Sequence, residues 1–303
     1  MKLLKLVPAE PNVDFLGMRR LAMILSCVLL LASTGLLVIR GLNLGIDFAG
    51  GVLIEVELQQ PAPLADLRTR LETLPIGEIT IQEFGAPEIL LLRFVPQGSE
   101  NNAAQTGITA VKEALAEQAK DFRRTEMVGP SIGAELQIQA LQAIGLALIL
   151  LMIYIWFRFE WQFSIGAVLA LGHDILLMLG FYSLTGIEFN LSSIAALLTI
   201  AGYSINDTVV IYDRVREDIR RFKSTPFIDV LNFAVNHTLS RTVMTSVTTL
   251  IALLSLALLG GSIIQDFALA LIFGVVAGTY SSVFLAVLFL VYAEPKRADM
   301  DND

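Results

Sequence analysis

Six apolar segments, each long enough to cross a lipid bilayer, constrain the fold of this 303-residue chain more than any other feature. A spanning helix needs about 20 mainly apolar residues, because the hydrocarbon core of a bilayer is about 30 Å thick and a helix rises about 1.5 Å per residue. The composition agrees, since 55% of the residues are hydrophobic and the mean hydropathy is +0.68. The sequence therefore predicts an all-α six-helix transmembrane bundle. The segments are Leu21–Ile39, Leu136–Phe157, Gln162–Thr185, Leu191–Tyr212, Thr242–Gly260 and Phe267–Tyr292.

Lys and Arg residues are divided unevenly between the two sides of such a bundle. The short connections Gly186–Asn190 and Gly261–Asp266 carry none, whereas a basic cluster lies between the fourth and fifth segments. Cytoplasmic loops carry the excess of Lys and Arg, so both termini are expected in the cytoplasm. The first segment has no small-x-small cleavage site and is expected to be an uncleaved anchor. This orientation makes residues 1–20, an amphipathic loop 213–240 and the tail 293–303 cytoplasmic, and places residues 40–135 outside, between helices 21–39 and those of 136–292.

The outer segment 40–135 is expected to form a domain of its own. Val52–Leu58 alternates apolar and acidic residues like a half-buried strand, and Gln105–Lys120 has apolar residues at helical spacing. With the remaining patterns, the order is strand, helix, two strands, helix, strand, which predicts an α+β ferredoxin-like (βαββαβ) domain. The other expected elements are a helix over Leu64–Leu74 and strands over Ile79–Phe84, Glu88–Phe94 and Phe122–Val128.

Asp207 stands within the fourth apolar segment, and Arg241 begins the fifth. A carboxylate at membrane depth costs about 2.5–3.5 kcal/mol on insertion scales, and it normally pairs, lines a water path or titrates. Arg241 is the plausible partner, with Thr245 one turn further along its helix. The pair suggests ion coupling, and the alternative is a static salt bridge that holds two helices together.

Asp174 is a second acid inside an apolar segment and is therefore a further candidate for the same relay. A structural hydrogen bond to a neighbouring helix is an equally good explanation. The adjacent His173 points about 100° away on a helix, so no dyad is expected.

Glycines mark two places where the backbone needs room. Gly45-Ile46-Asp47-Phe48-Ala49-Gly50-Gly51 follows the first span directly and is expected to turn the chain sharply into a strand, with Asp47 accepting hydrogen bonds from the turn. Gly274 and Gly278 form a small-residue seam for close helix packing. Because the chain holds a single six-helix set, we expect this seam to be a buried surface for a partner.

Several classes of function are disfavoured by the composition. The net charge of −8 argues against nucleic-acid binding. The single Cys27 excludes an internal disulfide, and His173 and His237 stand far apart without metal-binding spacing. No cofactor motif, metal site or nucleophile–base set is visible, so a transport component is predicted rather than an enzyme.

These residues together resemble the SecF family of preprotein translocase subunits, within the RND superfamily, over nearly the whole chain. The resemblance implies that Asp207, Arg241 and Thr245 belong to a proton-relay region and that the outer domain is periplasmic. It implies SecD as the heterodimer partner, the SecYEG channel, SecA, YajC and YidC as further partners, and an unfolded preprotein as the cargo. The motifs that carry it are Gly45-x-Asp47-Phe48-x-Gly50-Gly51, Gly202-Tyr203-Ser204-Ile205-Asn206-Asp207, Asp213-Arg214 and Ser240-Arg241-Thr242.

The sequence thus predicts a multi-pass protein of the bacterial inner membrane that uses the proton motive force to promote preprotein export, without a cofactor. Two alternatives remain at this point. One is half of an RND-type small-molecule exporter, and the other is a structural scaffold of the translocase that moves no protons.

Overall fold

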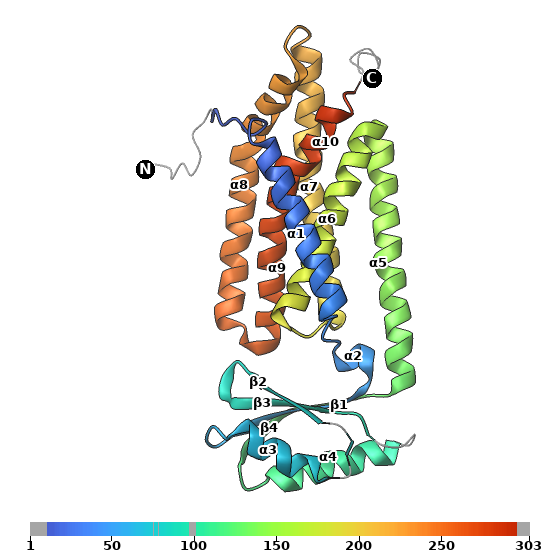
Figure 1. The fold of residues 1–303 in the computed structure, drawn as a ribbon, viewed down its shortest axis with the longest axis vertical. Helices are drawn as coiled ribbons and strands as arrows, with labels where there is room; N and C mark the ends of the chain where they lie inside the picture. Colours follow the sequence, from blue (N-terminus) through green and yellow to red (C-terminus); the bar gives the residue numbers. More distant parts are fainter. Residues whose placement is uncertain (1–10, 75, 78, 97–100, 296–303) are drawn as a thin grey trace. The chain divides into compact units, whose positions relative to one another are not determined.

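In a computed structural model, the chain forms a helical membrane unit and a small unit built on a β-sheet (Figure 1). The structure describes residues 11–74, 76–77, 79–96 and 101–295. The membrane unit comprises Met1–Asn43 and Ala143–Asp303, and the sheet unit comprises Leu44–Gln142. Half of the expected segment 1–20 and most of the tail 293–303 lie outside the described residues, namely 1–10 and 296–303.

Six helices of the described chain are long and apolar enough to cross a membrane, as the sequence predicted. The last of them changes from α-helix to one π-helical stretch, η1, and back. The helices are α1 (Arg19–Ile39), α5 (Pro130–Arg158), α6 (Trp161–Thr185), α7 (Leu191–Arg221), α8 (Phe227–Leu259) and α9 (Gly261–Ser281), which continues through η1 (Ser282–Ala286) into α10 (Val287–Tyr292).

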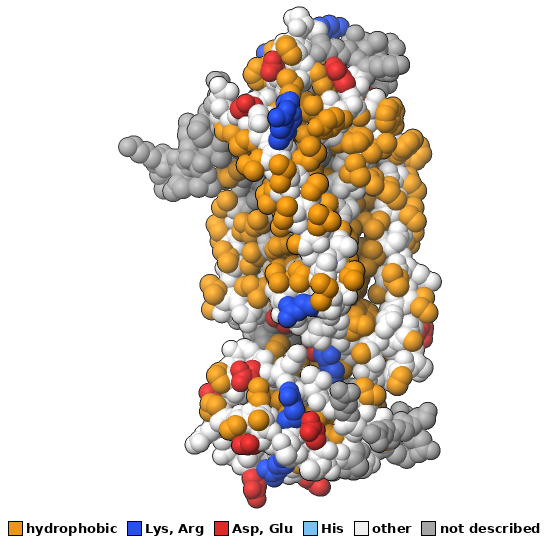
Figure 2. Space-filling view, viewed as in Figure 1, with side chains coloured by type: hydrophobic (Ala, Val, Ile, Leu, Met, Phe, Trp, Pro, Cys, Tyr) orange, Lys and Arg blue, Asp and Glu red, His pale blue; other side chains and the backbone are white. Residues whose placement is uncertain are grey.

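Three of the six spans form the centre of the membrane unit. In α6, α7 and the α9–α10 span, 61%, 56% and 61% of the most apolar stretch is buried, against 17%, 11% and 22% in α1, α5 and α8. Figure 2 shows apolar side chains over one face of this unit, as a lipid-facing surface requires. The start of α1, the end of α10 and the α7–α8 connection lie at the same end of the unit (Figure 1).

Most of the amphipathic loop that the sequence indicated at residues 213–240 is helical, because residues 213–221 end α7 and residues 227–240 begin α8. Residues 227–240 form the first turns of α8, which runs without a break into the fifth span. The apolar stripe of this stretch is buried, with Val230, Leu231 and Ala234 in the main core cluster. No Gly or Pro lies between Phe227 and Leu259, so nothing in the chain ends the helix at the membrane boundary.

The sheet unit has the predicted order of elements. Its four-stranded antiparallel sheet has the strand order β2-β3-β1-β4, and each helix connects two strands that are not neighbours. Val52, Ile54 and Val56 of β1 face the helices and form the core with Leu71 and Val111. The elements are β1 (Gly51–Leu58), α3 (Leu64–Glu72), β2 (Ile79–Phe84), β3 (Ala86–Phe94), α4 (Asn101–Leu115) and β4 (Ala119–Val128).

The last helix and strand of this unit differ from their expected boundaries. The helix α4 ends at Leu115 rather than Lys120, and β4 begins at Ala119 rather than Phe122. The second and third residues of β4, Lys120 and Asp121, are polar, but pairing with β1 and an ion pair of 2.6 Å between Lys120 and Glu57 hold this end of the strand in place. Lys120 and Arg123 hold the pKa of Glu57 below its usual value.

The glycine-rich corner contains a short helical turn that the sequence did not predict. Ile46–Ala49 forms α2, and Gly50 and Gly51 follow with φ of 72° and 115°. A side chain at Gly51 would collide with the carbonyl oxygen of Phe94, 2.8 Å from the position of its Cβ. The Gln137 amide of α5 donates to the Phe48 carbonyl at 2.7 Å. The corner therefore ties the start of β1 to the start of α5, which is a structural role.

Candidate functional site

Asp207 lies on α7 inside the membrane unit, with only 2% of its surface exposed. Its Oδ2 atom is buried and has no hydrogen-bond partner in the described part of the chain. A buried carboxylate oxygen without a donor is costly, by about 1–3 kcal/mol or more for a charged group. Asp207 is thus held in a position that favours either proton uptake or the approach of a cation.

Arg241 on α8 does not contact Asp207 in this structure, contrary to the expected pairing. Among the described residues, no hydrogen bond or ion pair within 4 Å joins the two side chains, and their attraction acts at longer range. Arg241 is exposed. It lines an open cavity of about 340 Å³ with Val210, Asp213, Arg214, Glu217, His237 and Thr238.

Thr245 does not reach the carboxylate either, because its hydroxyl donates to the carbonyl oxygens of Arg241 and Thr242 at 3.1 and 2.9 Å. The more buried face of α8 carries Thr242, which is 1% exposed, and Ser246, which is 6% exposed. The Thr242 hydroxyl is buried and has no partner among the described residues. Thr242 and Ser246 are one turn apart, and this i, i+4 spacing was the signal that could have identified them.

Asp174 on α6 is fully buried and, unlike Asp207, it is well satisfied. Its Oδ2 accepts hydrogen bonds from the hydroxyls of Ser204 on α7 and Ser281 on α9, at 2.6 and 2.7 Å. Its Oδ1 lies 3.1 Å from Nδ1 of His173. The expectation that these two neighbours do not interact was wrong, since their side chains bend toward each other across the shared backbone. Asp174 joins the three central spans.

Hydroxyl groups continue this polar region along the central helices. Thr208 of α7 and Ser282 of η1 are bonded at 2.9 Å, and Ser282 also donates to the carbonyl of Ser204 at 3.1 Å. Ser246 of α8 and Thr279 of α9 are bonded at 2.8 Å. None of these residues was among the predicted site residues, although Ser204 lies in one of the quoted motifs and two successive serines, 281 and 282, in an apolar segment were a visible signal.

The π-helical stretch η1 lies at the same level as this polar region. It begins at Ser282, and the carbonyl of its last residue, Ala286, accepts a hydrogen bond of 2.9 Å from the Tyr212 hydroxyl. π-Helical turns inside α-helices are rare and occur frequently at functional sites. In this part of the last span, the helix widens to a π-helical turn where Ser282 and the carbonyl of Ala286 bond to α7.

Gly274 and Gly278 pack against α7 within the chain, and a buried surface for a partner at this seam stays a prediction. A Cβ at Gly278 would lie 3.1 Å from the Cβ of Ser204 and 3.6 Å from Asp174 Oδ2. A Cβ at Gly274 would collide with the Ile200 side chain. The glycine seam therefore lets α9 approach α7 closely at Asp174.

The remaining motif residues lie around this site without joining it. Asn206 is exposed, and Tyr203 reaches Ser246 only at 3.5 Å, which is a marginal hydrogen bond. Asp213 forms an ion pair of 2.6 Å with Arg158 of α5. Arg214 contacts Glu217 and Asp218 on its own helix at 2.9 and 3.0 Å.

Comparison with known proteins places the chain in a family. Residues 108–296 match the family described as "Protein export membrane protein SecD/SecF, C-terminal", and residues 35–62 match "SecD/SecF GG Motif". "Protein translocase subunit SecF" of Magnetococcus marinus is 46% identical over 286 residues, 93% of this chain and 92% of that protein. The chain belongs to the SecF family of protein translocase subunits. The SecF of Rickettsia felis is 42% identical and covers 95% of this chain and 94% of its own.

A solved structure agrees with this assignment. The chain superimposes on SecDF from Thermus, described as a translocon-associated membrane protein, with a TM-score of 0.88 and 35% identity. The match covers 96% of this chain but 40% of that one. SecF membership makes this a multi-pass membrane protein that supports protein export by the Sec pathway, and the SecDF likeness supports association with SecD.

Proposed function

We propose that this chain, together with SecD, uses the proton motive force to promote preprotein export through SecYEG after the ATP-driven step of SecA. It works in the bacterial inner membrane with both termini cytoplasmic, and residues 40–135 work in the periplasm, where they meet the unfolded preprotein. YajC and YidC are further partners in the same assembly. The chain acts as a mechanical subunit and not as an enzyme.

The observation that carries this proposal is the difference between the two buried acids. Asp174 accepts two serine hydroxyl hydrogen bonds and contacts His173, so both of its carboxyl oxygens have partners. Asp207 is equally buried, yet its Oδ2 has no donor among the described residues. A group whose charged form is left unsatisfied exchanges protons when water or a cation reaches it.

We base the coupling between proton transfer and helix movement on the fact that Asp207 and Arg241 attract each other without being in contact. Charged Asp207 attracts Arg241, and neutral Asp207 releases it, so α7 and α8 have two arrangements. One proton crossing about 100 mV supplies roughly 2.3 kcal/mol, which shifts a two-state equilibrium about fiftyfold. That is enough to move a hinge. A static salt bridge, by contrast, needs an ion pair between Asp207 and Arg241, and the two side chains form none within 4 Å in the described chain.

Arg241 variants test the coupling by their order of effect. Arg241→Met is expected to remove the gain in export that a proton gradient gives, because charged Asp207 then has no mobile partner. Arg241→Lys keeps the charge and loses the planar fork, so a partial loss is expected. The measurement is completion of preprotein export in inverted membrane vesicles, with and without a proton gradient. Equal behaviour of Arg241→Met and the unchanged chain would contradict the pairing.

Cysteine labelling tests the orientation on which the proposal depends. In a Cys27→Ala chain, Glu117→Cys in the exposed α4–β4 connection is expected to react with a membrane-impermeant thiol reagent in whole cells. Lys223→Cys in the α7–α8 connection is expected to react only after the cells are opened. Both positions are exposed, so accessibility within the fold does not distinguish them. The reverse pattern would overturn the orientation.

A further inference from the structure

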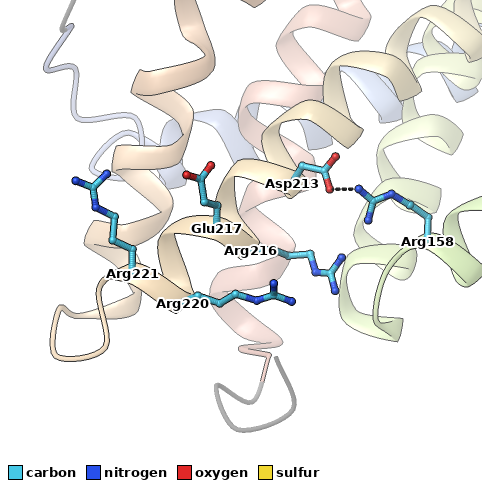
Figure 3. A pocket seen from close by; sticks show the side chains of 6 residues that line it. All are labelled: Arg158, Asp213, Arg216, Glu217, Arg220 and Arg221. Carbon is cyan, nitrogen blue, oxygen red and sulfur yellow. Dashed lines mark hydrogen bonds and ion pairs between the residues drawn. The ribbon is translucent and has the colours of Figure 1, made fainter. Parts of the chain in front are cut away.

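A basic pocket at the ends of α5 and α7 lies outside the site described above. It is an open cavity of about 490 Å³, lined by Arg158 at the end of α5 and by Asp213, Arg216, Glu217, Arg220 and Arg221 in the last turns of α7. Figure 3 shows the side chains of Arg216 and Arg220 extending from α7 to the side on which Arg158 of α5 lies, whereas Arg221 extends to the other side. Three cationic groups thus converge on one opening.

Two of these guanidinium groups are held in place by an aromatic ring. Arg158 lies 4.9 Å and Arg216 lies 5.9 Å from the centre of the Phe159 ring, and Phe159 is 5% exposed. Ion pairs fix them further, from Arg158 to Asp213 at 2.6 Å and from Arg216 to Glu160 at 3.2 Å. Fixed guanidinium forks lose little entropy when they bind an oxyanion, which they contact in bidentate geometry.

Arg220 leaves the pocket with a positive charge that the nearby acids do not balance. The second acid of the lining, Glu217, pairs with Arg214 at 2.9 Å. Among the described residues, no carboxylate lies within 4 Å of Arg220. A cation in the last turn of a helix interacts favourably with the helix dipole, and this would be a sufficient reason for the presence of Arg220. It does not account for the convergence of Arg158 and Arg216 beside it.

The surroundings of the pocket belong to a membrane interface. Trp156, Phe157 and Trp161, which flank Arg158 in the chain, are 62%, 86% and 52% exposed. Exposed aromatic side chains gather where acyl chains give way to headgroups. Ile149, Leu150 and Ile153 of α5 are also exposed, at 50%, 56% and 46%, so an apolar surface leads up to the pocket.

We propose that this pocket binds the phosphate headgroup of an anionic phospholipid, with Arg158, Arg216 and Arg220 contacting the phosphate oxygens and the acyl chains lying along α5. The shared chemistry is that of a phosphate oxyanion, and the exposed apolar surface of α5 favours the lipid over a soluble phosphate. Basic pockets between transmembrane helices on the cytoplasmic side are suited to such headgroups. A bound lipid would hold the end of α7 against α5.

The test is native mass spectrometry of the purified full chain, titrated with phosphatidylglycerol or with phosphatidylcholine. The unchanged chain is expected to prefer phosphatidylglycerol. Arg220→Gln is expected to weaken binding of phosphatidylglycerol about fivefold, the effect of one cation near an anionic surface, and to leave binding of phosphatidylcholine unchanged. The matched control is Arg20→Gln, an exposed arginine at the start of α1, at the same end of the membrane unit (Figure 1).

A second variant separates the pocket from net charge. Arg158→Gln combined with Asp213→Asn leaves the net charge unchanged and removes one guanidinium fork, so the preference for phosphatidylglycerol is expected to fall again. Equal losses of phosphatidylglycerol binding in Arg220→Gln and Arg20→Gln would overturn the proposal, since any exposed arginine would then contribute as much as the pocket. Displacement of the lipid by inorganic phosphate would also overturn it and identify a soluble anion as the ligand.

Discussion

An Asp207→Asn chain is expected to assemble normally and to lose the whole gain in preprotein export that a proton gradient gives to the unchanged chain. Asparagine has nearly the same shape as the protonated acid and cannot release a proton. We therefore expect α7 and α8 to stay in the arrangement that belongs to neutral Asp207. The substitution also removes the negative charge from a buried group whose Oδ2 has no donor, so we expect the fold to keep its stability. ATP-driven export without a gradient should remain.

The measurement is export completion in inverted vesicles, with and without a proton gradient, together with recovery of SecD by affinity purification. Asp229→Asn is the matched control, because it makes the same chemical change at an exposed position in the first turn of α8. If Asp207→Asn vesicles still gain fully from the gradient, Asp207 serves only to hold the structure and the proton-coupling proposal is wrong.

The spans and the strand–helix order could be predicted from the sequence because both depend on local patterns. Each span is a long, mainly apolar run, and the sequence of β1 alternates apolar residues with Glu55 and Glu57. Boundaries that depend on tertiary contacts could not be predicted in the same way. Lys120 joins β4 through its contact with Glu57, and α8 extends through Arg241 because the apolar face of its first turns is buried in the core.

The two acids of the site were identifiable because a charge in an apolar run stands out. The surroundings of the two acids could not be identified, because a serine or threonine hydroxyl can donate either to a carbonyl of its own helix or to a group on a neighbouring helix. Thr245 bonds to the backbone of its own helix, while Ser281 crosses to Asp174. The rotation of each helix about its axis decides between these outcomes, and it is set by packing features such as the glycine seam.

Gly278→Leu is expected to destabilise the membrane unit strongly, and Gly278→Ala less so. The added side chain has to displace Ser204, whose Cβ lies 3.1 Å from the position of the new Cβ, and Ser204 is a hydrogen-bond donor to Asp174. Overpacking costs about 1–3 kcal/mol, and a buried carboxylate that loses a donor costs about 1–3 kcal/mol more. The thermal midpoint of the purified chain should fall by about 5–15 °C.

Gly172→Leu on α6 is the control, since a Cβ there meets nothing within 4 Å. It adds the same volume to the same unit and is expected to leave the midpoint nearly unchanged. Both variants are compared by heating in detergent and measuring the monodisperse fraction, and recovery of SecD is measured in parallel. A Gly278→Leu chain with an unchanged midpoint and lost SecD would place the seam at the partner surface. A fallen midpoint in the isolated chain means that Gly278 acts by letting α9 bring Ser281 to Asp174.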